Sequence, residues 1–396
     1  MNKKFQLLKP ESSKLAIGLL SGTSVDGIDA VLVMLSGSGI KTRIKVLDFV
    51  TYKIPNIVKA AVLKNSSVRT ARIDEICRLN VILGKLFADS AIKICRKNNI
   101  KPSQVDFIGS HGQTIHHLPK HGKFLGFKQK STLQIGDPSV IANLTGITTV
   151  GDFRTADCSI GGDGAPLAPY LDYIQFASKT LNRALLNIGG ISNITILPKN
   201  CRKLDVLAFD TGPGNMLIDG IANKLFHKPF DKNGAYAKKG RINIPLMNWL
   251  RNDKYYREKP PKSTGREHYD EHFLTRLLKI SEGISNFDII STVTEFTVFS
   301  IWYNYELYLK RKTKIDELLI SGGGAKNPII VNGLKDYFKG VKVKHVNQSG
   351  INIDNKEAVL FAVLANECLT GNSANMPSVT GAKRNVVLGK VCLALN

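Results

Sequence analysis

The sequence predicts an α/β protein in which a unit that opens with a β-hairpin occurs twice. Three observations predict this fold class. Short apolar runs rich in β-branched residues alternate with longer runs that carry apolar residues at three- and four-residue spacing. Two hairpin patterns, at residues 15–35 and 183–197, each begin a series of strands and helices. At 396 residues, the chain is long enough for two domains with separate cores.

The elements follow from these patterns in order. Strands are expected at 16–20, 30–35, 45–52, 107–110, 147–150, 183–188, 193–197, 206–210, 317–321 and 342–345. Helices are expected at 71–98, 216–225, 272–280, 293–309, 328–338 and 358–368. The N-terminal domain is expected to comprise residues 1–150 and 380–396, and the C-terminal domain residues 151–379.

A hairpin-led α/β unit that occurs twice is the architecture of the actin, hexokinase and chaperone ATPases. The predicted fold is therefore a two-domain actin-like ATPase (ribonuclease H-like) fold with an interdomain cleft. A doubly wound α/β fold is the alternative, but it opens with a strand, a glycine turn and a helix rather than with an antiparallel hairpin. Neither GxGxxG at the start of a helix nor GxxxxGK[ST] occurs in the chain.

Charge and composition narrow the functional classes. There are 55 Lys and Arg against 32 Asp and Glu, a net charge of +23. The basic residues are spread along the chain without aromatic–basic runs, so we expect no nucleic-acid partner. There is no membrane-length apolar run and no secretory signal, so we expect no membrane partner. The six cysteines are far apart, which favours reduced thiols in a cytoplasmic protein.

The stretch GLLSGTSVDGID, residues 18–29, contains neither Lys nor Arg. Backbone N–H groups in a tight turn can bind a phosphate without a basic side chain. The residues available for this are Gly18, Gly22 and Gly27 with the hydroxyls of Ser21, Thr23 and Ser24. An ordinary β-turn uses the same residue types, so this stretch alone leaves both interpretations open.

Three further glycine-rich turns follow apolar strands. LLNIGGISNIT contains Gly189 and Gly190, and AFDTGPGN places Asp210 at a strand end before Gly212 and Gly214. LLISGGGAKNP contains Gly322, Gly323 and Gly324, whose entropic cost indicates the close approach of a flat ligand such as a nucleoside. A flexible loop is the alternative for each turn, but the four turns together predict a nucleotide cleft.

Two polar segments are weaker candidates. GSHGQTIHH places His111 at the end of a strand, where it lines a cleft or is merely structural. PPKSTGRE is a loop with Lys262, Arg266 and Glu267, which suits a carboxylate or phosphate of a substrate and equally suits a solvated loop.

The chain resembles the anhydro-N-acetylmuramic acid kinase family. The resemblance extends over residues 16–389 in a single order of motifs. These motifs are GLLSGTSVDGIDA, GSHGQTIHH, TLQIGDPSVIA, GGDGAPLAP, LNIGGISNIT, FDTGPGN, PPKSTGRE, SGGGAKNP and NKEAVLFAVLA. The combination of SGTSxDGID with FDTGPGN is highly specific to this family.

The resemblance implies a reaction and its participants. ATP and water would convert 1,6-anhydro-N-acetylmuramic acid into N-acetylmuramic acid 6-phosphate and ADP, as part of peptidoglycan recycling. It implies Mg²⁺, a homodimer and a cytoplasmic location. Asp210 would be the general base, residues 18–26 would hold the ATP phosphates, and residues 322–324 would lie by the nucleoside. The implied sugar ligands are His111, Arg154, Asp157 and Glu357.

The chain departs from the family and superfamily patterns at three places. The phosphate hairpin of actin-like proteins begins with an acidic residue where this chain has Leu20, so Asp26 or waters on ATP would have to hold the metal. Thr155–Ala156 and Asp163 replace the residues usual there, which puts the sugar contacts in question. Another actin-fold sugar or carboxylate kinase is the alternative function, and an ATP-driven chaperone or filament protein is a further one.

Overall fold

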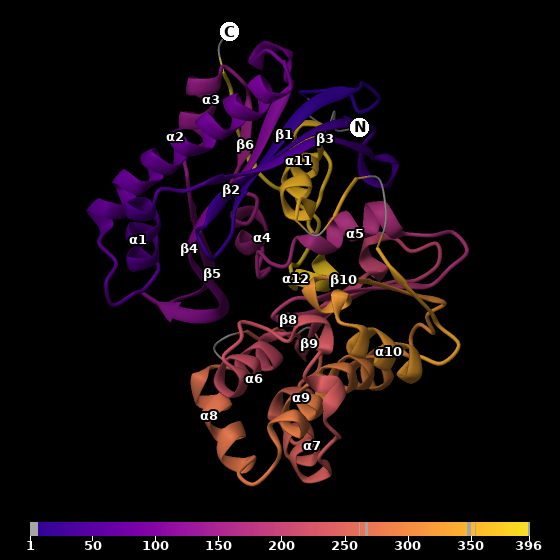
Figure 1. The fold of residues 1–396 in the computed structure, drawn as a ribbon. Coiled ribbons are helices and arrows are strands. Elements are labelled where there is room, and N and C mark those ends of the chain that lie inside the picture. The colour runs from indigo at the N-terminus through magenta and orange to yellow at the C-terminus, as the bar shows by residue number, and fades with distance from the viewer. Residues whose placement is uncertain (1–6, 261, 266–267, 347–349, 353, 395–396) are drawn as a thin grey trace. The chain divides into compact units, whose positions relative to one another are not determined.

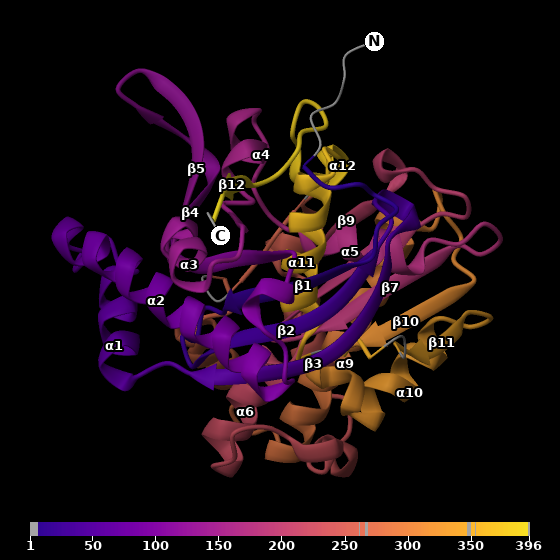
Figure 2. The same cartoon turned by 90° about the horizontal axis from the view of Figure 1, so that it is seen from above.

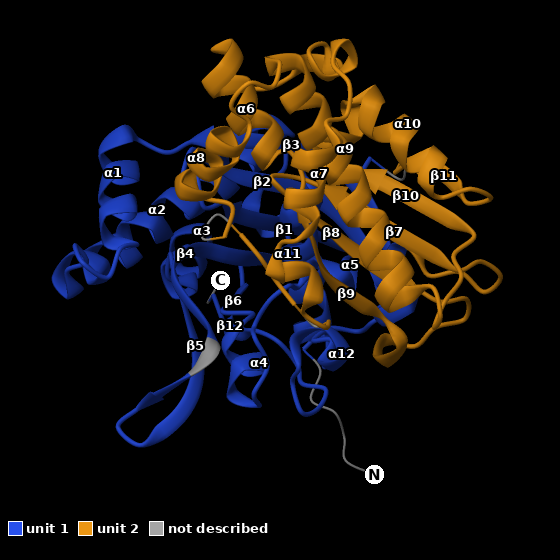
Figure 3. Ribbon diagram, turned by 90° about the horizontal axis from the view of Figure 1, so that it is seen from below, with its two compact units in different colours: residues 1–175, 347–396 blue, residues 176–346 orange. Residues whose placement is uncertain are grey.

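A computed structural model describes residues 7–260, 262–265, 268–346, 350–352 and 354–394 (Figure 1). The chain divides into two compact units. Unit 1 comprises residues 1–175 and 347–396, and unit 2 residues 176–346 (Figure 3). No helix in the described part of the chain is long and apolar enough to cross a membrane.

The sheet of unit 1 has seven strands in the order β12-β6-β4-β1-β2-β3, with β5 paired to β4 (Figure 2). The strands β1, β2 and β3 form an antiparallel meander, and β4 and β6 continue the sheet in parallel. The bounds are β1 (Lys14–Ser21), β2 (Gly27–Ser36), β3 (Arg43–Lys53), β4 (Phe107–Phe124), β5 (Phe127–Ile135), β6 (Thr149–Gly151) and β12 (Lys390–Cys392).

Helices cover both faces of this sheet. Ile17 and Leu19 of β1 belong to the core that includes Phe87 of α2, whereas Gly18, between them, lies against the backbone of α11. The helices are α1 (Asn56–Asn65), α2 (Ile73–Lys97), α3 (Pro138–Thr145), α4 (Thr155–Ser159), α5 (Ala168–Phe176), α11 (Lys356–Leu369) and α12 (Pro377–Thr380).

The sheet of unit 2 repeats this order with five strands, β11-β10-β7-β8-β9. An antiparallel meander again comes first, and β10 and β11 follow in parallel to β7. The strands are β7 (Arg183–Ile188), β8 (Ile191–Leu197), β9 (Leu207–Pro213), β10 (Glu317–Ser321) and β11 (Lys342–His345). The helices are α6 (Met216–Phe226), α7 (Ile244–Arg251), α8 (Glu271–Ile280), α9 (Asn286–Asn304) and α10 (Pro328–Tyr337). Two sheets with this common order confirm the predicted actin-like, ribonuclease H-like fold class.

The unit boundaries differ from the predicted ones. The first lies after Gln175 rather than after residue 150, and the return to unit 1 lies at Asn347 rather than at 380. The reason is α11, which packs on β1 and β4. A Cβ on Gly18 would lie 1.9 Å from the carbonyl oxygen of Ala358, and one on Gly109 would lie 2.1 Å from that of Phe361.

The hairpin of β4 and β5 was not expected beyond residue 110. Its tip carries Phe124, Leu125 and Phe127, which are 75%, 80% and 68% exposed. Between residues 110 and 135, polar residues and glycines interrupt the apolar residues, so this stretch lacks the longer apolar run that signals a core strand.

Gly18→Ala is expected to lower the free energy of unfolding by about 3 kcal/mol or more, because its new methyl group would displace the backbone of α11. Denaturant unfolding measures this loss. Gly22→Ala is the matched control, since a Cβ there meets no heavy atom within 4 Å. Equal unfolding midpoints for the two variants would contradict the close packing of β1 on α11.

Candidate active site

A cavity of ≈ 510 Å³ in unit 1 brings together seven of the predicted site residues. It is lined by the end of β1 and the turn after it, by β4, by the loop around α4 and by the start of α11. His111 lies within β4 and not at a strand end as predicted, because β4 continues to Phe124. The seven residues are Ser21, Gly22, Thr23, Ser24, His111, Arg154 and Glu357. Four of the predicted residues in this unit, Gly18, Asp26, Gly27 and Asp157, are not among those that line it.

The turn between β1 and β2 has properties of an anion site. The Ser21 hydroxyl is buried and has no hydrogen-bond partner among the described residues. The backbone N–H groups of Thr23 and Ser24 likewise find no acceptor in the described part of the chain. Val25 adopts a φ of +55° although it is β-branched and buried, a strained conformation that is typical of functional sites. These features fit the phosphates of a nucleotide.

Arg154 presents a positive charge to the cavity from a partly buried position. Its Nε donates to Nε2 of His111 at 2.9 Å, and its Nη1 donates to the carbonyl oxygen of Gly164 at 2.7 Å. Both acceptors are neutral, and no ion pair of Arg154 is found within the described ranges. The carboxyl group of Glu357, which also lines the cavity, interacts electrostatically with Arg154. A partly desolvated guanidinium whose hydrogen bonds go only to neutral groups can in addition attract an anionic ligand.

His111 holds Arg154 in place. Because Nε2 accepts from Arg154, the proton lies on Nδ1, which donates to the carbonyl oxygen of Gly112 at 3.1 Å. Burial, reinforced by the charge of Arg154, holds the pKa of His111 well below its usual value. The ring packs on Phe361 with centroids 4.5 Å apart. The imidazole is therefore neutral and orients the guanidinium.

Asp157 lies inside unit 1 and does not line the cavity. Its Oδ2 accepts from the N–H of Gly164 at 3.0 Å, and its Oδ1 accepts from Asn375 Nδ2 and Thr380 Oγ1, both at 3.0 Å. It is fully buried. These bonds hold the loop whose Gly164 carbonyl accepts from Arg154, so Asp157 supports the site instead of contacting a ligand.

Two carboxyl groups of unit 1 have raised pKa values. Burial raises the pKa of Asp29, which lies directly opposite Leu20 in the β1–β2 register. Burial also raises the pKa of Glu357, with Asp29 adding to the shift and Arg154 opposing it. Asp29 thus places a carboxyl group next to the position where the hairpin has Leu20, and the sequence analysis missed it. Asp26 is exposed and paired with Lys59.

In unit 2, the glycine motifs pack on one another. The N–H of Gly214 donates to the carbonyl oxygen of Gly190 at 2.8 Å, and that of Asn215 to Gly189 at 2.7 Å. Gly322 has a φ of +90°, and a Cβ there would lie 2.4 Å from the carbonyl oxygen of Ile188. A Cβ on Gly324 would lie 2.3 Å from Ile188 Cγ2, whereas Gly323 and Gly212 border Asn215 and Tyr256. Packing within unit 2 therefore explains Gly322 and Gly324 without a ligand.

The buried helix α9 supports the end of β9, which follows Asp210. Asn304 Nδ2 donates to the carbonyl oxygen of Thr211 at 2.8 Å, and Thr297 Oγ1 donates to that of Gly214 at 2.9 Å. Asp210 itself receives the N–H of Thr264 on Oδ2 at 3.0 Å. Asp210 lies within β9 and not at its end as predicted, because β9 stays paired with β8 as far as Pro213. A carboxylate held by a backbone donor on a supported strand is well placed to accept a proton.

Comparison with known proteins agrees with these features. The sequence model described as anhydro-N-acetylmuramic acid kinase matches residues 14–394. The kinase of this name from Caldanaerobacter subterraneus subsp. tengcongensis is 43% identical over 387 residues, covering 97% of this chain and 98% of the relative. The chain belongs to the anhydro-N-acetylmuramic acid kinase family.

The anhydro-N-acetylmuramic acid kinase of Clostridioides difficile (strain 630) is 44% identical over 377 residues, which cover 95% of this chain and 97% of that protein. Among solved structures, component A of the Acidaminococcus fermentans (R)-2-hydroxyglutaryl-CoA dehydratase gives a TM-score of 0.41 at 12% identity, covering 89% of this chain and 98% of that one. The predicted family is thus confirmed by sequence relatives, and the fold class by strand order.

The structure describes only part of the segment PPKSTGRE, residues 260–267. Arg266 and Glu267 lie outside the described residues. Lys262 is buried and donates to the carbonyl oxygen of Tyr255, so it does not extend into solvent as a basic loop residue would. The Thr264 hydroxyl, which the sequence analysis missed, is buried without a partner in the described ranges and lies beside Asp210.

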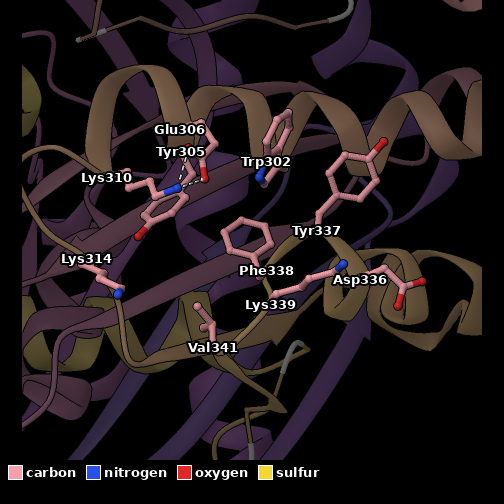
Figure 4. Close-up of a pocket in the computed structure, with 10 residues that line it drawn as sticks. All are labelled: Trp302, Tyr305, Glu306, Lys310, Lys314, Asp336, Tyr337, Phe338, Lys339 and Val341. Carbon is pink, nitrogen blue, oxygen red and sulfur yellow. Dashed lines mark hydrogen bonds and ion pairs between the residues drawn. The ribbon is translucent and has the colours of Figure 1, made fainter.

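A larger cavity of ≈ 560 Å³ lies elsewhere in unit 2 (Figure 4). Aromatic side chains of α9, its π-helical end and α10 form its walls, and lysines stand at its rim. Lys310 is paired there with Glu306 at 2.7 Å. None of the predicted site residues lines this cavity.

Proposed function

We propose that this chain phosphorylates 1,6-anhydro-N-acetylmuramic acid with ATP and water, giving N-acetylmuramic acid 6-phosphate and ADP in peptidoglycan recycling. The observation that carries the proposal is the family match over residues 14–394. The charge of Arg154 supports it, because the lactyl carboxylate of the sugar is an anion that this guanidinium would attract.

The proposed reaction releases one proton, which comes from the attacking water. The water oxygen bonds to C1 of the sugar as the bond from C1 to O6 breaks, and O6 bonds to the γ-phosphorus as ADP leaves. Asp210 takes the proton of the water as general base. Transfer of the phosphoryl group itself depends mainly on positioning and neutralisation of charge. Thr264, which donates its N–H to Asp210, orients the carboxylate.

ATP and Mg²⁺ are the proposed cofactors. We assign the phosphates to Ser21, Thr23 and Ser24, whose unpaired donors fit them. No group of three or more His, Cys, Asp or Glu that could hold a metal occurs among the described residues. Mg²⁺ would therefore arrive on the nucleotide and would neutralise phosphate charge, with Asp29 and Glu357 as the carboxyl groups that its charge would compensate.

The finer family properties are part of the same proposal. We propose that the nucleoside lies by Gly323, that the kinase is a cytoplasmic homodimer, and that the glycines of β7–β8 and β9 shape the nucleotide site. Light scattering of the purified protein is expected to give twice the mass of one chain, and the mass of a single chain would contradict the dimer.

The experiment that tests the function uses water labelled with ¹⁸O. Purified protein, ATP and the anhydro sugar are expected to give a phosphorylated product that carries one ¹⁸O at C1, as mass spectrometry shows. Glucose and N-acetylmuramic acid serve as comparison acceptors. An unlabelled product, or a preference for glucose, would instead support a conventional sugar kinase.

A further inference from the structure

Lys262 is enclosed by three tyrosine rings. Its side chain is only 8% exposed. The ammonium nitrogen lies 4.4 Å from the ring centroid of Tyr255, 5.0 Å from that of Tyr308 and 5.9 Å from that of Tyr256. It also donates to the carbonyl oxygen of Tyr255 at 3.1 Å. Aromatic faces attract a cation within about 6 Å, so the three rings form a cage for this ammonium.

The rings of this tyrosine cage are themselves held. The Tyr308 hydroxyl donates to the carbonyl oxygen of Tyr256 at 2.9 Å, and the hydroxyls of Tyr256 and Tyr269 lie 3.4 Å apart. The Tyr255 hydroxyl donates to the backbone carbonyl oxygen of Asp210 at 2.5 Å. The cage is therefore connected directly to the residue proposed as the base.

The segment that carries Lys262 contacts Asp210 at two further points. The N–H of Asp210 donates to the carbonyl oxygen of Lys262 at 3.2 Å. Two residues on, the N–H of Thr264 donates to the carboxylate at 3.0 Å. The carboxylate, N–H and carbonyl of Asp210 are thus all bonded to Lys262's segment or to its cage.

We propose that Lys262 is a positioning residue for Asp210. Its ammonium, held in the tyrosine cage, fixes the segment 262–264 so that the Thr264 N–H is directed at the carboxylate. Lys262 acts through the loop and not on the substrate. This inference rests on the proposed function, in which Asp210 is the base.

Because Lys262 can lose its charge, its positioning of Asp210 is sensitive to pH. Burial lowers the pKa of Lys262 to about 8, and the charge of Glu258 opposes this shift. The other titratable groups around it are the cage tyrosines, which burial keeps neutral by raising their pKa values. The His268–Asp253 pair lies beyond Tyr255. Above about pH 8 the neutral amine loses its attraction to the rings, and Asp210 loses a fixed partner.

The free energy of unfolding changes with pH in the opposite direction to kcat. Between pH 8 and 10.5 the folded protein has released the proton of Lys262 while the unfolded chain still binds it. Through this group, the free energy of unfolding therefore rises with pH. Loss of kcat above about pH 8 without loss of thermal stability is thus a signature of positioning.

The test compares three variants of the whole protein. Lys262→Met keeps the apolar stem but removes the charge, and is expected to lower kcat about 10–100-fold with KM values changed less than about 3-fold. Lys262→Arg keeps a charge that does not titrate, so it is expected to retain most of the activity and to lose the alkaline decline above about pH 8. Lys259→Met, at an exposed lysine of the same loop, is the matched control and should resemble the wild type.

Three results would overturn the inference. Wild-type kcat in Lys262→Met would show that the charge is not needed. A rise in KM for the sugar with kcat unchanged would place Lys262 on the substrate. If Lys262→Arg is as impaired as Lys262→Met and keeps the alkaline decline, the tyrosine cage contributes only packing. Should Lys262→Met not fold, the pH profile of Lys262→Arg alone decides between the outcomes.

A measurement that does not depend on catalysis distinguishes this inference from the proposed function. In NMR spectra of ¹⁵N-labelled protein, the amide proton of Thr264 is expected to exchange slowly with solvent in the wild type. In Lys262→Met this exchange is expected to be at least about tenfold faster. Absent kinase activity in the wild type would overturn the proposed function, whereas unchanged Thr264 exchange would overturn the role of Lys262.

Discussion

Asp210→Asn is expected to abolish turnover of the anhydro sugar while ATP still binds. An amide of nearly the same shape cannot accept the proton of the attacking water, and loss of a general base lowers rates by about 10²–10⁴-fold. The fold should persist, because the Thr264 N–H can bond to the amide oxygen and the backbone bonds to Tyr255 and Lys262 do not involve the side chain.

Coupled assay of ADP release measures the rate, and calorimetry measures ATP binding. Asp205→Asn is the matched control, because this exposed carboxylate, paired with Arg202, lies just before the same strand. Turnover in Asp210→Asn comparable to that of Asp205→Asn would remove Asp210 from the role of base.

Arg154→Gln is expected to raise KM for the sugar about 10–100-fold, because a hydrogen bond to a charged group contributes about 1.5–3 kcal/mol. The variant also removes the donor to His111 Nε2, so the anion site loses both its charge and its orientation. A second measurement avoids catalysis: the sugar should raise the thermal midpoint of the wild type and leave that of Arg154→Gln unchanged.

Arg78→Gln, at an exposed position of α2, is the matched control for loss of one positive charge. Its thermal shift with the sugar should equal that of the wild type. If Arg154→Gln keeps both the shift and KM while kcat falls, the guanidinium acts on the transferring phosphoryl group and not on the carboxylate of the sugar.

The elements were largely predictable because their patterns are local. The hairpins at β1–β2 and β7–β8 follow from short apolar runs around small-residue turns, and α2 follows from apolar residues at three- and four-residue spacing. The helix predicted at 293–309 begins earlier, at Asn286. The family was predictable for a similar reason, since motifs such as FDTGPGN keep their residues in order along the chain. Of the seven predicted residues of the unit 1 cavity, Arg154 and Glu357 were predictable only as members of such motifs, whereas the hairpin residues and His111 were candidates from their residue types as well.

The roles of several glycines and charges were not predictable, because they depend on segments far apart in sequence. Gly18 belongs to a phosphate-site motif, yet the structure places it in β1 against Ala358 of α11. Asp157 resembles a ligand until Asn375 and Thr380 occupy its oxygen atoms. The boundary between the units moves to Asn347 for the same reason, as α11 completes the packing of unit 1.

By itself, the sequence determined the repeated hairpin-led fold, the family and the types of residue at the site, because these depend on short-range pattern and composition. Only the tertiary structure decided which of those residues face a cavity and which serve as supports. Arg154 is a proposed anion site because it is partly buried in the cavity while His111 and Gly164 supply only neutral acceptors. Lys262 becomes an anchor because three tyrosines from two segments of unit 2 enclose it. Charge and burial at one point in space are properties that no local stretch of sequence contains.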